Sequence, residues 1–329
     1  MNVGACCEPD RTRRVSFASP APTGQGSQAA APVVAASPAS ARWRLDPGSV
    51  RFALAVRLRH RWEGFVDDVE GARTFSVAGA TYDAFMGRYS VALAEQFVEA
   101  AGVRRGQTAV DVGCGPGALT AVLVDRLGAG SVVACDPSAP FVAECSARHP
   151  EVEVASGRAE AVPFESDRFD HAMAQLVLHF VSDPDAAARE MMRVVRPGGR
   201  VSACVWDFAD GMEMLRGFWD AALEVDPSAP DEAQRLRFGR PGEIAQLFES
   251  AGMDTVVEST LRVSSRYRDF DELWQGFLAG VGPAGAFCAS LVEDDRTRLR
   301  AALFRRFGSP DGPFTLGAVA RCAVARVPV

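Results

Sequence analysis

The feature that most constrains the fold of this chain is the segment Thr108-Ala-Val-Asp-Val-Gly-Cys-Gly-Pro-Gly-Ala-Leu-Thr120. Its first residues are apolar and predict a buried strand, the alternating glycines predict a tight loop, and residues 118–127 predict a helix. Glycines let backbone N–H groups and the N-terminus of that helix approach a ligand closely, because no Cβ stands in the way. The segment therefore predicts a strand, loop and helix that bind a ligand at the loop.

The spacing of the glycines fits two kinds of ligand. Gly113, Gly115 and Ala118 satisfy the dinucleotide pattern G-x-G-x-x-G/A. Asp111, at the end of the strand, would repel a pyrophosphate but would suit the α-ammonium of S-adenosylmethionine (SAM). The pattern Asp-x-Gly-x-Gly-x-Gly resembles the first motif of class I SAM-dependent methyltransferases. That resemblance implies SAM contacts from Asp111 and from the loop residues Gly113, Cys114, Gly115 and Gly117.

The segment Ser131-Val-Val-Ala-Cys-Asp136 predicts a second strand that ends in an acid. In a doubly wound sheet the carboxyl end of this strand lies beside the first, so Asp136 can accept both hydroxyls of a ribose. The alternative is that Asp136 only caps the helix that begins at Ser138. We place Pro137, the next residue, in the same binding site.

The segment Gly157-Arg-Ala-Glu-Ala-Val-Pro-Phe164 resembles the segment that binds the adenine of SAM in this family. The resemblance implies contacts from Arg158, Ala159 and Glu160. Arg158 replaces the acid that the family carries there, so we expect the backbone of Ala159 to meet the ring and Arg158 to stack on it.

The lead-in Thr81-Tyr-Asp-Ala-Phe-Met-Gly-Arg-Tyr-Ser90 resembles the family's cover over the methionine end of SAM. This implies contacts from Tyr82 and Arg88, with Arg88 pairing with the ligand carboxylate. The alternative is that both are surface residues of a capping helix.

Two candidates lie in or directly after the predicted fourth strand, residues 170–178. Gln175 is a further expected SAM contact. The imidazole of His179 titrates near neutrality and could take a proton from the methyl acceptor, so His179 is the candidate catalytic residue. A histidine that merely lines the crevice is the other interpretation.

A final block, a helix followed by Arg196-Pro-Gly-Gly-Arg200 and a strand at 201–207, also resembles the family. The family fold is α/β, a doubly wound Rossmann-like sheet with helices on both faces. Its seven strands follow the order 3-2-1-4-5-7-6, with strand 7 antiparallel. Residues 255–263 and 314–327 match the last two strands.

The domain organisation follows from composition. Residues 1–75 are predicted to form a disordered or weakly structured extension, and residues 76–329 the SAM-dependent methyltransferase domain, with a lid insertion around 209–240. Apolar residues near this insertion favour an apolar or aromatic small-molecule acceptor. They are Trp206, Phe208, Met212, Leu215, Phe218 and Trp219.

Charge and cysteine content narrow the function further. The net charge of −7 disfavours a nucleic-acid partner. The eight cysteines show neither CxxC nor zinc spacing, which predicts reduced thiols, a cytoplasmic location and no metal site. No apolar run is long enough for a membrane span, and the sequence indicates no oligomeric state.

The expected activity is metal-free, in-line transfer of a methyl group from SAM to O, C or N of a small acceptor, similar to the ubiquinone/menaquinone-biosynthesis methyltransferases. The alternatives are an NAD(P)-dependent oxidoreductase on a Rossmann sheet and a non-catalytic SAM-binding module.

Overall fold

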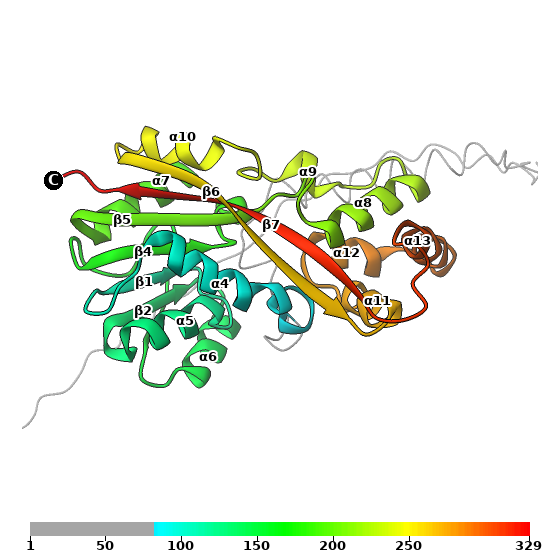
Figure 1. Ribbon diagram of the computed structural model, residues 1–329, viewed down its shortest axis with the longest axis horizontal. Helices are drawn as coiled ribbons and strands as arrows, with labels where there is room; N and C mark the ends of the chain where they lie inside the picture. The colour runs from blue at the N-terminus through cyan, green and yellow to red at the C-terminus, as the bar shows by residue number, and fades with distance from the viewer. Residues whose placement is uncertain (1–81) are drawn as a thin grey trace, which may run out of the picture. The chain divides into compact units, whose positions relative to one another are not determined.

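The computed structural model describes residues 82–329, which form a seven-stranded sheet flanked by helices (Figure 1). The expected extension at 1–75 lies outside the described residues. The strands are β1 (Ala109–Val112), β2 (Val132–Asp136), β3 (Glu153–Ser156), β4 (Phe169–Gln175), β5 (Val195–Trp206), β6 (Asp254–Tyr267) and β7 (Phe314–Arg326).

The strand order is β3-β2-β1-β4-β5-β7-β6, which confirms the predicted topology. Strand β1 pairs in parallel with β2 and β4, and β7 runs antiparallel to both β5 and β6. Every residue of β1 and β2 is buried, as expected for central strands that helices cover on both faces. The carboxyl ends of the parallel strands therefore meet at one edge of the sheet, where ligands bind in folds of this kind.

Helices cover both faces of the sheet. Helices α4 (Arg88–Ala101), α5 (Ala118–Leu127) and α6 (Ala139–Arg148) belong to one apolar cluster or pack beside it, and α7 (Pro184–Val194) and α10 (Glu243–Ser250) belong to the other. Figure 1 shows α4 and α5 in front of the strands. In α7, Pro184 occupies the first turn and the Asp183 carboxylate accepts a hydrogen bond from the Ala186 N–H, so the sequence Asp-Pro fixes where the helix begins.

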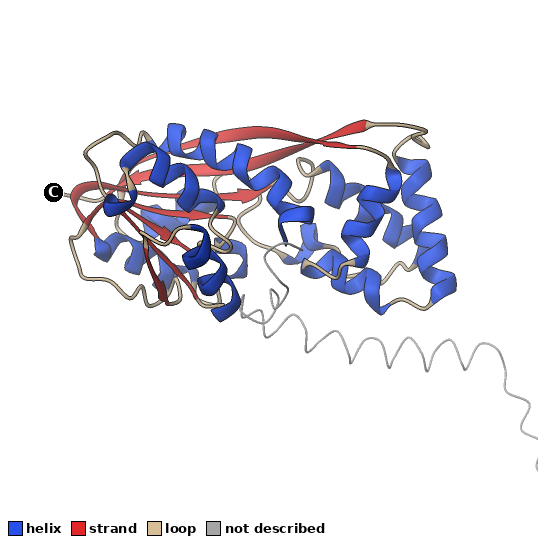
Figure 2. Cartoon of the chain, turned by 90° about the horizontal axis from the view of Figure 1, so that it is seen from below, coloured by secondary structure: helices blue, strands red, loops and turns tan. Residues whose placement is uncertain are grey.

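A group of helices lies beyond the carboxyl ends of the strands, and we call it the helical cap. It consists of α8 (Glu213–Val225), α11 (Phe270–Leu278), α12 (Gly282–Ser290) and α13 (Glu293–Arg306). Strands β6 and β7 stay paired as far as Tyr267 and Phe314, and Figure 2 shows them running out to this group. The cap therefore comes from two parts of the chain, the connection after β5 and the connection between β6 and β7.

Three sequence interpretations need correction. The expected lid at 209–240 contains α8 and the short α9 (Glu232–Arg235) but only part of the cap. Helix α12 was not predicted, because its glycines, proline and alanines give no apolar stripe. Strand β5 begins at Val195 rather than 201, since Val195 already pairs with Phe169 before the turn at Gly198.

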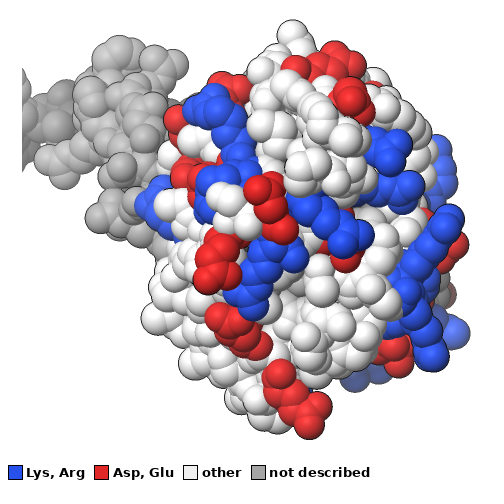
Figure 3. All heavy atoms as spheres, turned by 90° about the vertical axis from the view of Figure 1, so that its left-hand side faces the viewer, with Lys and Arg blue, Asp and Glu red and all other residues white. Residues whose placement is uncertain are grey.

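The described surface is mixed in charge. Figure 3 shows arginines and acidic residues interspersed over one face, without a broad area of one sign. Within residues 82–329, no helix combines the length and apolarity that crossing a bilayer requires.

Candidate functional site

A cavity opens where the carboxyl ends of β1, β2, β4 and β5 face the cap. Its empty space, about 1130 Å³, includes open solvent at the mouth. Its wall includes most of the predicted site residues: Tyr82, Gly113, Gly115, Asp136, Pro137, Arg158, Ala159, Glu160, Gln175 and His179.

The glycine loop forms one wall of the cavity. Gly113 has φ +75°, and a Cβ on it would lie 2.5 Å from Cγ2 of Val177, so the loop and the chain after β4 approach each other only because Gly113 has no side chain. Gly115 has φ +53° and faces open space, where a ligand can approach its backbone.

Two loop residues that were expected to contact SAM do not line the cavity. Cys114 is buried, and Gly117 faces α6, where a Cβ would lie 3.1 Å from the Sγ of Cys145. Gly117 has φ +98° and precedes α5, so it makes the turn into that helix. From their positions, Cys114 and Gly117 shape the loop rather than touch the contents of the cavity.

Asp136 lies in the cavity wall and is nearly buried. Its carboxylate accepts one hydrogen bond from the Gly115 N–H at 2.9 Å and another from the Ser138 N–H at 2.8 Å. Burial raises its pKa, although these two N–H groups act in the opposite direction. The carboxylate thus braces the glycine loop and the start of α6, and its remaining lone pairs can accept donors from a ligand.

Asp111 does not line the cavity, contrary to the sequence interpretation. Its side chain lies on the α5 side of β1, where Oδ2 accepts a hydrogen bond from the Thr120 hydroxyl at 2.6 Å. It is 1% exposed, and desolvation raises its pKa to about 7. The expected direct contact with a ligand ammonium is not available from this position, because the carboxyl is enclosed between strand and helix.

This burial gives a prediction for stability. The folded-state pKa of Asp111 lies above its unfolded value, so the folded protein binds the proton more tightly and the group lowers stability as pH rises from about 4 to about 7. Asp111→Asn should therefore differ from the wild type by about 1 kcal/mol or less at pH 4.5 and exceed it by roughly 2–4 kcal/mol at pH 8. Denaturant unfolding at both pH values measures this; an equal difference at the two pH values would contradict it.

Arg158, Ala159 and Glu160 meet the cavity after β3. The guanidinium of Arg158 lies 3.5 Å from Oε1 of Glu160, and the same oxygen accepts a hydrogen bond from the Ser182 N–H at 3.1 Å. Glu160 therefore links this loop to the chain after β4. Ala159 is buried and offers its backbone to the cavity wall.

Tyr82 and Arg88 were expected together, but the structure separates them. Tyr82 lines the cavity, with its ring 5.8 Å from that of Phe141. Arg88 points away: it donates to Ser265, pairs with Glu272 at 3.0 Å and stacks on Tyr267. The expected pairing of Arg88 with a ligand carboxylate is corrected, because its guanidinium is already held between α4 and β6.

Three buried polar atoms in the cavity wall have no hydrogen-bond partner among the described residues. They are Oε1 of Gln175, Nδ1 of His179 and Nε1 of Trp206. Gln175 is oriented by its other end, which donates to the Ser90 carbonyl at 3.0 Å. Leu176, which follows, has φ +63°, a costly conformation for leucine that turns the chain toward His179. Unpartnered buried polar atoms are rare in proteins, so their clustering here indicates a binding site for a polar group.

The environment of His179 is apolar. Its ring lies 4.0 Å from that of Phe180 and 5.2 Å from that of Phe208, and burial lowers its pKa to about 3. The imidazole is therefore neutral at physiological pH, which makes it a weak base. This environment favours the lining role over the role of proton acceptor.

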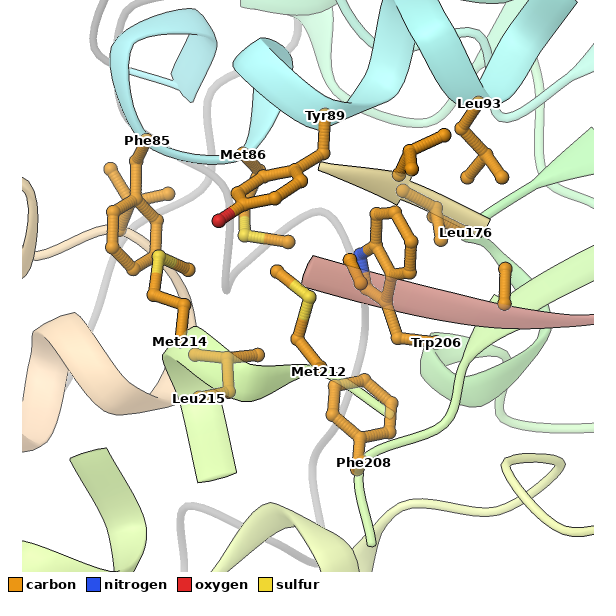
Figure 4. Packing of buried hydrophobic residues seen from close by; sticks show 14 of the residues in the cluster. Phe85, Met86, Tyr89, Leu93, Leu176, Trp206, Phe208, Met212, Met214 and Leu215 are labelled. Carbon is orange, nitrogen blue, oxygen red and sulfur yellow. The ribbon is translucent and has the colours of Figure 1, made fainter. Parts of the chain in front are cut away.

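The apolar residues expected around the acceptor divide into two groups. Trp206, Phe208 and Leu215 line the cavity. Met212, Phe218 and Trp219 are fully or almost fully buried and belong to the apolar core. Figure 4 shows Trp206 between Tyr89 on α4 and Phe208 below it, with Met86 and Leu215 toward the cap.

Sequence reasoning missed two parts of the wall. Glu232, at the start of α9, is 4% exposed and reaches the cavity from the expected lid insertion, in which no site residue was assigned. The start of α12, residues 281–284, closes the cavity on the cap side. The one signal for Glu232 was an acid that follows a Pro- and Asp-rich stretch, which normally indicates a solvated turn.

Comparison with known proteins finds methyltransferases. A family model described as a methyltransferase domain matches residues 110–203. Demethylmenaquinone methyltransferase of Beutenbergia cavernae is 38% identical over 104 residues, covering 32% of this chain and 42% of that protein. The ubiquinone/menaquinone biosynthesis C-methyltransferase UbiE of Escherichia coli is 36% identical over 111 residues, covering 32% and 44%. Malonyl-[acyl-carrier protein] O-methyltransferase of Erwinia billingiae is 31% identical over 148 residues, covering 45% and 57%.

The chain spans about half the length of these curated relatives. The part matched by the family model runs from β1 into β5 and contains the glycine loop, Asp136, the Arg158 loop, Gln175 and His179. With the antiparallel β7 inserted between β5 and β6, the sheet has the strand order that these motifs indicate. Residues 110–203 therefore form a methyltransferase domain, and the chain is similar to class I SAM-dependent methyltransferases of the ubiquinone/menaquinone-biosynthesis group.

Proposed function

We propose that this protein transfers a methyl group from SAM to a small, apolar or aromatic acceptor. The observation that carries the proposal is the cavity itself: one end has the glycine loop and a buried carboxylate, and the other has an aromatic wall. The two ends of one continuous cavity suit a nucleoside donor and an apolar acceptor.

The residues of the glycine-loop end fit SAM. Asp136 would accept the ribose hydroxyls with the lone pairs that Gly115 and Ser138 leave open. The backbone of Ala159 would meet the adenine, with Arg158 and Glu160 beside it, and Tyr82, Pro137 and Gln175 would complete the wall. SAM supplies an activated methyl group when bound, so the protein's own task is to orient the two molecules and exclude water.

The acceptor end determines what is methylated. Relatives include a C-methyltransferase and an O-methyltransferase, so similarity alone leaves the acceptor atom open. The aromatic rings of Trp206, Phe208 and Phe180 favour an apolar body. We propose that the cap segments, α8 and α9 together with the start of α12, form the lid over it. The six described cysteines are free and buried, which supports a reducing, cytoplasmic location.

The proposed lining role of His179 can be tested by pH. Because the pKa of His179 is lowered to about 3, its charge does not change between pH 5.5 and 8.5. His179→Gln should lower the rate of methyl transfer by less than about tenfold and leave the shape of the pH–rate profile unchanged. Loss of an inflection between pH 6 and 7 on substitution would show that His179 accepts a proton during turnover.

The activity is tested by incubating the purified full-length protein with methyl-labelled SAM and a metabolite extract. Mass spectrometry should find the label in one or a few small molecules together with S-adenosylhomocysteine (SAH). Binding of SAM without any labelled product would instead favour the non-catalytic SAM-binding module.

A further inference from the structure

Glu232 is a buried acid that the proposed methyl transfer does not use. Its side chain lies in the cavity wall and is 96% enclosed, at the N-terminus of the short helix α9. Oε2 accepts a hydrogen bond from Nε1 of Trp219 at 2.6 Å. Among residues 82–329, no group donates a hydrogen bond to Oε1. This oxygen is therefore available to a ligand in the cavity.

The position of Glu232 is fixed by neighbouring groups. The guanidinium of Arg216 on α8 binds both oxygens of Asp231, at 3.1 and 3.0 Å, and Asp231 caps α9 by accepting from the Ala233 N–H. This two-point contact ties α9 to α8, and the Trp219 N–H then orients the Glu232 carboxyl. These contacts hold the Glu232 carboxyl in one orientation at the cavity wall.

The protein compensates the charge of Glu232 only in part, because burial and Asp231 raise its pKa while the Trp219 N–H and Arg216 lower it. Arg216 is engaged by Asp231 and by Asp220, at 2.8 Å, so its single positive charge already faces two carboxylates. Among the described residues that line the cavity, Arg158 is the one arginine, and it lies with Glu160. Consistent with this, burial raises the pKa of Glu232 to about 7.

Glu232 lies toward the acceptor end of the cavity. Asp136 ends β2, whereas α9 is held by α8, the helix that follows β5. Strands β1 and β4 lie between β2 and β5, which separates the two strand ends by roughly 14 Å. Figure 1 shows α9 on the side of the molecule where α8 lies. The indole N–H of Trp219 contacts the Glu232 carboxylate, and the residues that α8 and the start of α12 add to the cavity wall include Leu215 and Val281.

We propose that Glu232 binds a protonated amine of the methyl acceptor, which makes the acceptor an apolar or aromatic amine. This rests on the proposed methyl transfer and defines the substrate class of the same site. An ammonium group satisfies the open oxygen and also neutralises the buried charge, whereas a neutral hydroxyl would do only the first.

The test compares matched probes on the full-length protein saturated with SAH. 2-Phenylethylamine and 4-phenylbutylamine are titrated at pH 8 beside 2-phenylethanol and 4-phenylbutanol, and dissociation constants are measured by ligand-observed NMR. At least one amine should bind about tenfold more tightly than its alcohol, as one charge-assisted hydrogen bond provides. In Glu232→Gln, whose amide can still accept from Trp219, this ratio should fall to about one. Glu249→Gln, at an exposed position on α10, should keep it.

SAH affinity separates this proposal from the proposed function. If Glu232→Gln binds SAH like the wild type, the variant is folded and its lost amine preference belongs to the acceptor end. The proposal is overturned if no amine binds more tightly than its alcohol, if the preference survives in Glu232→Gln, or if that variant loses SAH affinity about tenfold, because Glu232 would then serve the donor. A wild type that fails to bind SAH contradicts the methyltransferase function. The amines and alcohols are then titrated against the protein without SAH.

Discussion

Asp136→Ala should weaken SAH binding by about 100-fold or more. Two hydroxyl groups that donate to a buried carboxylate contribute roughly 1.5–3 kcal/mol each, and the substitution removes both contacts. It also leaves the N–H groups of Gly115 and Ser138 without their acceptor, so the glycine loop loses its brace. Isothermal titration calorimetry of wild type and variant with SAH measures the effect.

Asp125→Ala is the matched control, because Asp125 is an exposed acid on α5, the helix that follows the same loop. It should bind SAH like the wild type. Asp136→Asn separates the two roles of the carboxylate, since its amide oxygen can still accept from one backbone N–H; it should fall between wild type and alanine. Wild-type affinity in a folded Asp136→Ala protein would remove Asp136 from the binding site.

Phe218→Ala should destabilise the protein by about 3–5 kcal/mol, the range for a large aromatic side chain lost from a core. Phe218 is fully buried in the helical cap, stacked on Phe277 at 4.3 Å and in edge contact with Trp219 at 5.1 Å. Its removal leaves a cavity between α8 and α11 that the surrounding rings cannot fill without moving. Chemical denaturation at neutral pH measures the loss.

Val292→Ala provides the comparison, because Val292 is 67% exposed at the start of α13 and should change stability by less than about 0.5 kcal/mol. The sequence interpretation placed Phe218 among the apolar residues that favour an apolar or aromatic acceptor. A variant of unchanged stability that fails to bind an acceptor would place Phe218 in the binding wall, against the burial observed here.

The order of the strands was predictable because it depends on features that are local in sequence. The apolar runs that form β1 and β2, the glycines at 113 and 115, and Asp136 after β2 are each determined by a few neighbouring residues. The strand order itself, including the reversed β7, came from the resemblance of four such blocks to one family. The positions of Gly113, Gly115 and Asp136 in the cavity wall followed from that fold.

The direction of individual side chains was less predictable, because it depends on partners that are distant in sequence. Arg88 was assigned to a ligand carboxylate, but Ser265 and Glu272 hold it instead. Asp111 was assigned to a ligand ammonium, but its strand position turns it toward Thr120 on α5. The sequence motif shows that an acid is present at this position. The packing of α5 against β1 determines whether its side chain faces the helix or the cavity.

The acceptor end was the least predictable part. Helix α12 lacks a periodic apolar pattern, and α9 is a short helix in a Pro- and Asp-rich stretch. Neither sequence pattern therefore predicts that the segment lines the cavity. Glu232 becomes a candidate only when Arg216 and Trp219 are seen to hold it against the cavity.

The central claim is that the cavity beside the glycine loop takes SAM and not a dinucleotide. Because Asp111 is turned away, this discrimination depends on Asp136 and the surrounding wall, and a direct comparison tests it. Calorimetric titration of the purified protein with SAM and with NADH, under the same conditions, should give micromolar-range binding of SAM and none measurable for NADH. Tighter binding of NADH than of SAM would contradict the account and revive the oxidoreductase alternative.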